Sequence, residues 1–386
     1  MLFRIRNFLG FLLSAALVLV ILVAGLAWFL FRPGGLHADL TGAPLLEGST
    51  LEVAAVSDRP VGDVVVTPEG RLFFTLHPAA AGPGPRLFEW VDGAARPFGA
   101  AAGLETPFAL GIDGQNRIWV ADPGRLGLGT PRLVAFDLTT GAPLHEHTFP
   151  RGVTPWGSWL NDLAVSADGN WVYLADAGVA SHRAALVVYN VRDRRSYRML
   201  AGHETVSPRD FLIRAPGRDM ALLGGQIALK PGVAALSLSE DGDWLHYAAA
   251  NHDTAYRIPV EGLQNPNFST VRVAVDIQTV GTKPLGEGIA TAGAALLATD
   301  VEHGAVMRLL PDGRTQTVLR DDRLRWPGQL ATGPDGALYV ADSALQHVLL
   351  RDAGAVAAAA PFTIWRIPAP PPAVPLDPLT GRPVQP

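Results

Sequence analysis

Cysteine is absent from the 386-residue sequence, which excludes a disulfide framework and any chemistry that depends on a thiol. A basic excess is also missing, because 31 lysines and arginines stand against 36 aspartates and glutamates. The formal net charge of −5 therefore gives no electrostatic footprint for nucleic acid. The sequence also lacks a glycine-rich phosphate loop and a Gly-x-Ser-x-Gly motif, which argues against nucleotide-loop and α/β-hydrolase chemistry.

One long apolar segment stands near the start of the sequence. Residues 8–31 contain no charged side chain for 24 positions. As a helix this segment would span about 36 Å, more than the bilayer core of about 30 Å. Trp28 lies near its end, where interfacial aromatic residues are common. The apolar core of a signal peptide is only about 7 to 15 residues, so we predict an uncleaved membrane anchor rather than a cleaved signal peptide.

The charges around this segment indicate its orientation. Arg4 and Arg6 precede the apolar run and Arg32 follows it, which favours a cytoplasmic N-terminus. The rest of the chain is therefore predicted to lie on the extracytoplasmic, periplasmic side of the membrane. Residues 33–47 are rich in glycine and proline and read as a tether between anchor and domain.

A strand–turn–strand pattern dominates the remaining sequence. In SWLNDLAVSADGNWVYLADAG, alternating apolar residues flank a glycine-containing turn, which is the signal of a β-hairpin. The pattern recurs about every 45 to 70 residues, a spacing close to that of β-propeller blades. Six copies predict an all-β, six-bladed β-propeller, whose blades bury their faces against one another. The copies cover residues 62–78, 110–124, 158–178, 233–251, 286–304 and 327–343.

The apolar segment and the repeated hairpins together predict the domain organisation. The 41 glycines and 32 prolines suit a turn-rich all-β domain. Residues 51–56 and 362–367 are both candidates for closing the ring, and residues 203–230 are expected to carry a loop or short helix over one face. The predicted parts are a cytoplasmic stub and transmembrane anchor (1–32), a tether (33–49), the propeller (50–367) and a proline-rich, extended or disordered tail (368–386).

Several longer pieces of the repeats resemble one family of propellers. They are GRLFFTLHP in the first blade, RIWVADPG in the second, SWLNDLAVSADGNWVYLADAG in the third and DDRLRWPGQLATGPDGALYVADS in the sixth. They resemble the royal jelly protein/yellow family in its bacterial, dopachrome tautomerase-related form. That family is similar in turn to the gluconolactonase/senescence marker protein propellers. The resemblance covers about residues 50–367. It implies six blades and a ligand pocket at one mouth of the central channel, and it leaves the activity open.

Polar residues recur where the innermost strand of each blade begins, a place that faces the propeller axis. Convergence of such groups is typical of a ligand site. Glu287, a carboxylate between two glycines, is predicted to act as a catalytic base or ligand hook, since burial raises the pKa of such a group. Asp162 is the second catalytic candidate. The alternative for Asn161 and Asp162 is that they cap turns and tie blades together through backbone hydrogen bonds.

Further ligand-binding candidates surround these positions. Asp63, Asn161 and Gln329 stand at equivalent places in other blades, and His77 and His303 follow strands near the same face. For both histidines a packing or loop role is the alternative. Trp326, before Pro327, is expected to form a wall at the start of the sixth blade, because proline suits the first position of a strand.

The resemblance to gluconolactonases implies a divalent cation such as Ca²⁺, held by carboxylate and amide oxygens. Asn161, Asp162 and Glu287 match parts of that ligand set. Ala234 stands in place of the expected asparagine, and Val61 or Gly62 in place of the expected glutamate. These losses count against a high-affinity cation site.

The sequence leaves three functions open. The first is a membrane-anchored propeller that binds a small organic molecule at the channel mouth, with or without tautomerase-like isomerase chemistry. The second is a gluconolactonase-like, metal-assisted lactone hydrolase, and the third is a non-enzymatic protein-interaction scaffold. The expected partners are a small molecule and the membrane, and the protein is expected to be a monomer.

Overall fold

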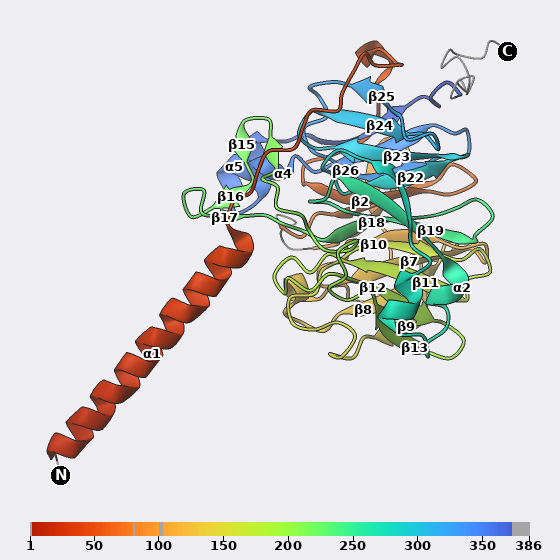
Figure 1. Cartoon of the computed structure of the whole chain (residues 1–386). Coiled ribbons are helices and arrows are strands. Elements are labelled where there is room, and N and C mark those ends of the chain that lie inside the picture. Colours follow the sequence, from red (N-terminus) through yellow and green to blue (C-terminus); the bar gives the residue numbers. More distant parts are fainter. Residues whose placement is uncertain (1, 80–81, 83, 100–102, 373–386) are drawn as a thin grey trace.

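The computed structural model describes residues 2–79, 82, 84–99 and 103–372. In this part of the chain, six four-stranded antiparallel sheets surround a central channel, and a long helix extends from one end of the ring (Figure 1). The predicted six-bladed propeller is therefore confirmed. The predicted tail beyond residue 372 lies outside the described residues.

Each blade is a meander whose first strand lines the channel. Blade one holds β2 (Val61–Val66), β3 (Leu72–Leu76), β4 (Leu87–Val91) and β5 (Ala94–Pro97). Blade two holds β6 (Leu110–Ile112), β7 (Arg117–Asp122), β8 (Arg132–Asp137) and β9 (Pro143–Thr148). Blade three holds β10 (Leu160–Val165), β11 (Trp171–Asp176), β12 (Ala185–Asn190) and β13 (Arg195–Met199).

The second half of the chain repeats the arrangement. Blade four holds β18 (Val233–Leu238), β19 (Trp244–Ala249), β20 (Thr254–Pro259) and β21 (Gln278–Thr282), with α2 (Val260–Leu263) and α3 (Thr270–Ala274) between its last two strands. Blade five holds β22 (Ile289–Ala292), β23 (Ala295–Asp300), β24 (Ala305–Leu309) and β25 (Thr315–Arg320). Blade six holds β26 (Pro327–Thr332), β27 (Leu338–Asp342), β28 (Phe362–Ile367) and β1 (Glu52–Ser57).

The turn between the first and second strands is equivalent in all six blades. In each one a residue adopts a positive φ, between 58° and 84°, which glycine and asparagine accept most readily. This is the reason that the hairpin signal repeats in the sequence. The residues are Gly70, Asn116, Gly169, Gly242, Gly293 and Gly336.

Blade six closes the ring with strands from both ends of the domain. β1 pairs with β28 as the outermost strand, and β28 pairs with β27. Both candidate closing segments are thus used, one beside the other. Hydrogen bonds between the two ends of the domain leave no unpaired break in the ring of blades.

Buried aspartates at the ends of four second strands organise the loops that return to the channel. Asp342 accepts the Trp326 N–H at 2.8 Å and the Ala344 N–H at 3.0 Å, and Asp176 does the same for Trp159 and Gly178. Buried backbone donors need such partners, because an unpaired buried N–H costs free energy. Asp122 and Asp300 occupy the equivalent strand ends.

A cap of short elements covers one end of the channel. It comprises two small hairpins between blades three and four and two short helices between β27 and β28. The expected loop or short helix over residues 203–230 therefore takes the form of hairpins. Figure 1 shows the cap at the end of the ring from which the long helix leaves. Its elements are β14 (Arg214–Ala215), β15 (Arg218–Asp219), β16 (Ala221–Leu222), β17 (Ile227–Ala228), α4 (Leu345–Val348) and α5 (Ala353–Ala358).

The long helix α1 covers Leu2–Phe31. Its segment Arg6–Phe31 has a mean hydropathy of 2.8 and is unburied, and is long and apolar enough to cross a membrane. The chain returns to the cap directly afterwards, because the Gly35 N–H donates to the Asp210 carbonyl at 3.0 Å and the Leu212 N–H donates to the Gly35 carbonyl at 2.8 Å. By length and composition α1 fits either an anchor or a signal sequence.

We expect the full-length protein to sediment with membranes and to resist extraction by high salt, because the helix is long enough to span the bilayer core. Fractionation followed by intact-mass measurement checks this, and the recovered chain should retain residues 8–31. A soluble mature chain that begins near Gly34 would contradict the anchor.

Candidate functional site

A cavity of about 260 Å³ lies at the cap end of the channel. Its polar groups are His77, Asn161 and Glu287, which come from blades one, three and five, together with the indole of Trp159. The rest of its wall is mainly aliphatic and comes from the cap and from the loops after β3 and β11: Ala79, Val179, Ala180, Leu229, Pro231, Leu345, Leu349 and Leu350. A mostly apolar cavity with a few convergent polar groups is typical of a small-molecule site.

Glu287 stands in the loop before β22 and keeps part of its surface open to this cavity. Its Oε1 accepts a hydrogen bond of 2.7 Å from the Trp326 Nε1–H. Burial raises the pKa of the carboxyl, and the hydrogen bond from Trp326 opposes that shift. The result is a carboxyl group that Trp326 holds in place beside the cavity.

The glycines on both sides of Glu287 are required by close backbone approach. A Cβ added at Gly286 would lie 2.0 Å from the Thr299 carbonyl oxygen, and one at Gly288 would lie 2.2 Å from the Gly328 carbonyl oxygen. No real Cβ contact is that short, so larger residues would displace the loop. Gly286 thus lets the loop lie against β23 of its own blade, and Gly288 lets blades five and six approach closely beside Glu287.

Asn161 and Asp162 both face the axis although they are neighbours in sequence. The pairing of β10 with β11 shifts register between Leu160 and Asp162, and such a β-bulge re-aims side chains that would otherwise alternate. Both residues lie within the first strand of their blade, and Asp63 and Gln329 lie within the first strands of theirs. The Asn161 carboxamide accepts from the Trp159 indole at 2.9 Å and donates to the Ala234 carbonyl at 2.8 Å.

Asp162 and Asp63 connect neighbouring blades. The Asp162 carboxylate accepts the N–H of Leu163 at 2.7 Å and that of Leu236, in the next blade, at 2.6 Å. Asp63 repeats the arrangement, with the N–H of Leu110 in the next blade at 2.7 Å. These contacts are those expected of the structural alternative, in which the acids tie blades together.

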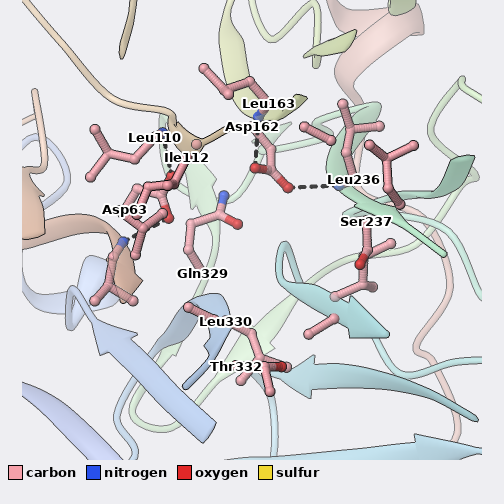
Figure 2. Close-up of a pocket in the computed structure, with 18 of the residues that line it drawn as sticks. Asp63, Leu110, Ile112, Asp162, Leu163, Leu236, Ser237, Gln329, Leu330 and Thr332 are labelled. Atoms are coloured by element: carbon pink, nitrogen blue, oxygen red, sulfur yellow. Dashed lines mark hydrogen bonds between the residues drawn. The ribbon is translucent and has the colours of Figure 1, made fainter. Parts of the chain in front are cut away.

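The two aspartates line a second cavity, of about 290 Å³, at the end of the channel opposite the cap. Figure 2 shows this cavity in close-up. Gln329 lies between them in this view. Its amide donates to the Asn161 carbonyl at 3.2 Å and so links the opposite blades six and three across the channel. The predicted polar set is therefore divided: Asn161, Glu287 and His77 line the cap-end cavity, whereas Asp63, Asp162 and Gln329 line the other.

Burial raises the pKa of Asp63 to about 7, with a smaller contribution from the charge of Glu287. Burial and the Asp63 charge also raise the pKa of Asp162 well above its usual value. The pKa of an unfolded aspartate is about 3.9, so the folded state binds these protons more tightly. The stability that this protonation contributes is complete below about pH 4 and is lost as the pH rises through about 7.

We therefore expect the free energy of unfolding to fall between pH 5 and pH 8, and to fall less in the Asp63→Asn variant. Denaturant unfolding at several pH values checks this. Asp335→Asn is the control, because Asp335 is exposed, pairs with Arg366 and has a lowered pKa. Equal pH slopes for wild type and Asp63→Asn would contradict the assignment.

His77 is a buried, neutral imidazole beside the cavity. Burial lowers its pKa to about 4. Its Nδ1 accepts the Ala79 N–H at 3.2 Å, which leaves the proton on Nε2, and its ring meets Phe108 edge-on at 5.2 Å. The cavity thus holds one N–H donor and one carboxylate acceptor on different blades.

His303 does not share this cavity, contrary to the expectation from sequence. The turn after β23 directs it outwards, where its Nδ1 bonds to Asp300 at 2.9 Å and Asp300 raises its pKa. It lines a separate hollow with the tether residues His37 and Asp39. His303 lies at the cap end of the propeller, but its side chain lines the hollow beside the tether and not the channel cavity. The repeat pattern gave no indication of where the tether would pack.

A family model described as "Major royal jelly protein" matches residues 106–361. The chain belongs to the major royal jelly protein family. Major royal jelly protein 3 of Apis mellifera is 22% identical over 227 residues, which are 55% of this chain and 40% of that protein. Major royal jelly protein 1 of Apis mellifera is 25% identical over 199 residues, 48% of this chain and 44% of that protein. The chain thus matches about two fifths of the length of these relatives.

Solved structures agree on the fold of this royal jelly family member. A calcium-binding protein, regucalcin, from Agrobacterium tumefaciens superposes with a TM-score of 0.54 at 14% identity, over 85% of this chain and 96% of that one. A structure assigned to the gluconolactonases gives a TM-score of 0.52 at 15% identity, over 86% and 94%. At these identities the likeness shows the six-bladed architecture alone.

The ligand set implied for a divalent cation does not converge in this royal jelly family member. Asp162 lines the cavity at the far end of the channel and uses its two oxygens to bridge Leu163 and Leu236, whereas Asn161 and Glu287 line the cap-end cavity. Among the described residues, the cluster of potential ligands within 4.8 Å of one another is Asp39, Asp300 and His303, outside the channel. The described residues therefore do not reproduce the implied cation site in the channel.

Two tryptophans hold site residues through hydrogen bonds that the sequence did not predict. Trp159 lines the cavity and holds Asn161, and Trp326 holds Glu287. Trp326 is buried in the apolar cluster under the cap and is not part of the cavity wall, as a packing residue should be. The signal was present, since both tryptophans stand two or three residues before an axial position in the SWLND and RLRWPGQ pieces.

Proposed function

We propose that this protein is a membrane-anchored propeller that binds a small organic molecule in the cap-end cavity. The observation that supports it is Glu287, a single fixed carboxylate held by Trp326 at the polar end of an otherwise aliphatic cavity. A buried carboxyl group with a raised pKa in a cleft is a candidate functional residue, and unlike Asp63 and Asp162, Glu287 does not use its carboxyl to bridge backbone N–H groups of two blades. The anchor, the periplasmic location of the propeller and the monomeric state are parts of the same proposal.

The cavity favours a compact, largely apolar ligand with a hydrogen-bond donor. Its volume of about 260 Å³ is at the lower end of small-molecule sites, which span about 300–1,000 Å³. Glu287 accepts an N–H or O–H group, and a cationic donor beside it would favour the charged carboxylate that burial by itself disfavours. Organic amines are therefore the first class of ligand that we propose, with the apolar body against Trp159 and the aliphatic wall.

A matched pair of ligands tests this proposal. 2-Phenylethylamine and 3-phenylpropionate have similar size and opposite charge, and calorimetry on the purified full-length protein measures the binding of each. We expect the amine to bind and the carboxylate to bind at least tenfold more weakly. Ala180→Trp, which places a large side chain in the cavity wall, should remove binding of the amine. Equal affinities, or binding that survives the Trp substitution, would contradict the proposal.

Proton transfer is the second function that we propose for the same cavity. Glu287 would remove a proton from one atom of a ligand and return it to another, while the Nε2–H of the neutral His77 imidazole would donate a hydrogen bond to the atom that becomes negative. Deuterium exchange from solvent into an enolisable ketone, followed by NMR, checks this. Exchange no faster than without protein would exclude the isomerase function and leave binding intact. A metal-assisted lactone hydrolase is not proposed, because its cation ligands do not converge.

A further inference from the structure

Four large apolar side chains stand exposed on loops at the cap end of the propeller. They are 63% to 77% exposed: Leu128, Trp156, Leu223 and Leu350. The loops join β7 to β8, β9 to β10, β16 to β17 and α4 to α5. The first strand of each blade runs away from the cap, and the strands of a blade alternate in direction. The second and fourth strands therefore end at the cap, and the loops that follow them lie there. The four tips therefore occupy one face.

Arginines accompany these tips. The Arg151 guanidinium lies 3.9 Å from the centre of the Trp156 ring, Arg125 is three residues before Leu128, and Arg351 follows Leu350. Apolar or aromatic side chains beside arginines are typical of surfaces that enter the lipid headgroup region, where the guanidinium meets phosphate. Single exposed apolar side chains are common on aqueous surfaces, so the relevant feature is that four of them share one face with arginines.

The apolar helix leaves the molecule at this same face. The Phe31 ring contacts His182 at 5.1 Å, and Gly35 is bonded to the cap through Asp210 and Leu212. Residues 32–34 can span at most about 10 to 14 Å, so the cap end must lie close to wherever the helix ends. Figure 1 shows the helix leaving beside β16 and β17.

We propose that the cap end of the propeller rests on the bilayer surface, with the four tips in the headgroup layer and the cavity opening against lipid. Leu350 shows that the cavity adjoins this surface, because it is both one of the four exposed tips and part of the cavity wall. The ligand class that reaches Glu287 is then one that dissolves in the membrane, an apolar molecule with a polar or cationic head. This inference rests on the anchor in the proposed function, and not on the identity of the ligand.

The absence of cysteine makes a direct test available in the full chain. Leu128→Cys, Trp156→Cys, Leu223→Cys and Leu350→Cys each receive one environment-sensitive fluorophore, and the protein is reconstituted into liposomes. The controls are Val271→Cys and Val275→Cys, which are 77% and 74% exposed but lie around α3, at the opposite end of the propeller. Lipids that carry a quencher near the headgroup report contact with the membrane.

We expect a blue-shifted emission and strong lipid quenching at the four tips, and neither at the two controls. If the protein floats with the liposomes but the tips behave like the controls, the docking inference is wrong and the anchor stands. If the protein does not float with liposomes, the anchor fails and the inference fails with it. The readout needs no added ligand, so a failure of the amine proposal is distinguishable from both outcomes.

Discussion

Glu287→Gln should weaken ligand binding by roughly 10- to 100-fold, the effect of losing one charged hydrogen bond worth about 1.5 to 3 kcal/mol. The glutamine has the same shape and can still accept the Trp326 N–H, so the cavity keeps its form. It loses the negative charge and can present an N–H group where the ligand has its own donor. Calorimetry with 2-phenylethylamine measures the change.

The melting temperature of Glu287→Gln should be unchanged or raised, because a desolvated carboxylate costs stability that a functional site tolerates. Glu302→Gln is the matched control. Glu302 is also a partly buried carboxyl, with a pKa raised to about 6, but it lies outside the cavity. Its substitution should leave binding unchanged. If Glu287→Gln unfolds the protein, or leaves binding intact, Glu287 is structural and the site assignment fails.

Trp326→Ala should lower the free energy of unfolding by about 3 to 5 kcal/mol, as for other large buried aromatic side chains. The indole is 3% exposed and packs with Leu345, Val348 and Phe362 under the cap. Its removal leaves a cavity there and also removes the hydrogen bond that holds Glu287. Denaturant unfolding of the purified variant measures the loss.

Two further variants separate the packing of Trp326 from its hydrogen bond. Trp326→Phe keeps most of the buried volume, so it should cost less stability while raising the pKa of Glu287, because the hydrogen bond that opposes the shift is lost. Trp156→Ala is the control for a tryptophan at the same end of the propeller but exposed, and its cost should be below about 1 kcal/mol. A cost well under 1 kcal/mol for Trp326→Ala would mean that the ring is not packed.

The repeated hairpin was enough to predict the blade count and the turns. A turn with positive φ favours glycine and asparagine, and this local preference leaves a mark at each repeat, as at Gly169 and Asn116. Glu287 was identified for a similar reason. The sequence shows a carboxylate between two glycines, which indicates a functional position. The structure shows that both glycines are needed where backbones approach closely.

The roles within the site depended on contacts between distant segments. A one-residue bulge in β10 directs Asn161 to one cavity and Asp162 to the other, and no sequence pattern marks such a shift. Asp162 bonds to a residue 74 positions away, and Glu287 to one 39 positions away, because consecutive blades bring their first strands together at the axis.

The sequence by itself determined the apolar helix, the six blades, their turns and the membership of a family, because each depends on local chemistry repeated along the chain. Only the tertiary structure decided which polar residues share a cavity, where His303 lies and which face the helix adjoins. Those features depend on register, on the hairpins of the cap and on the bond of Gly35 to Asp210, which join segments that no repeat or motif connects.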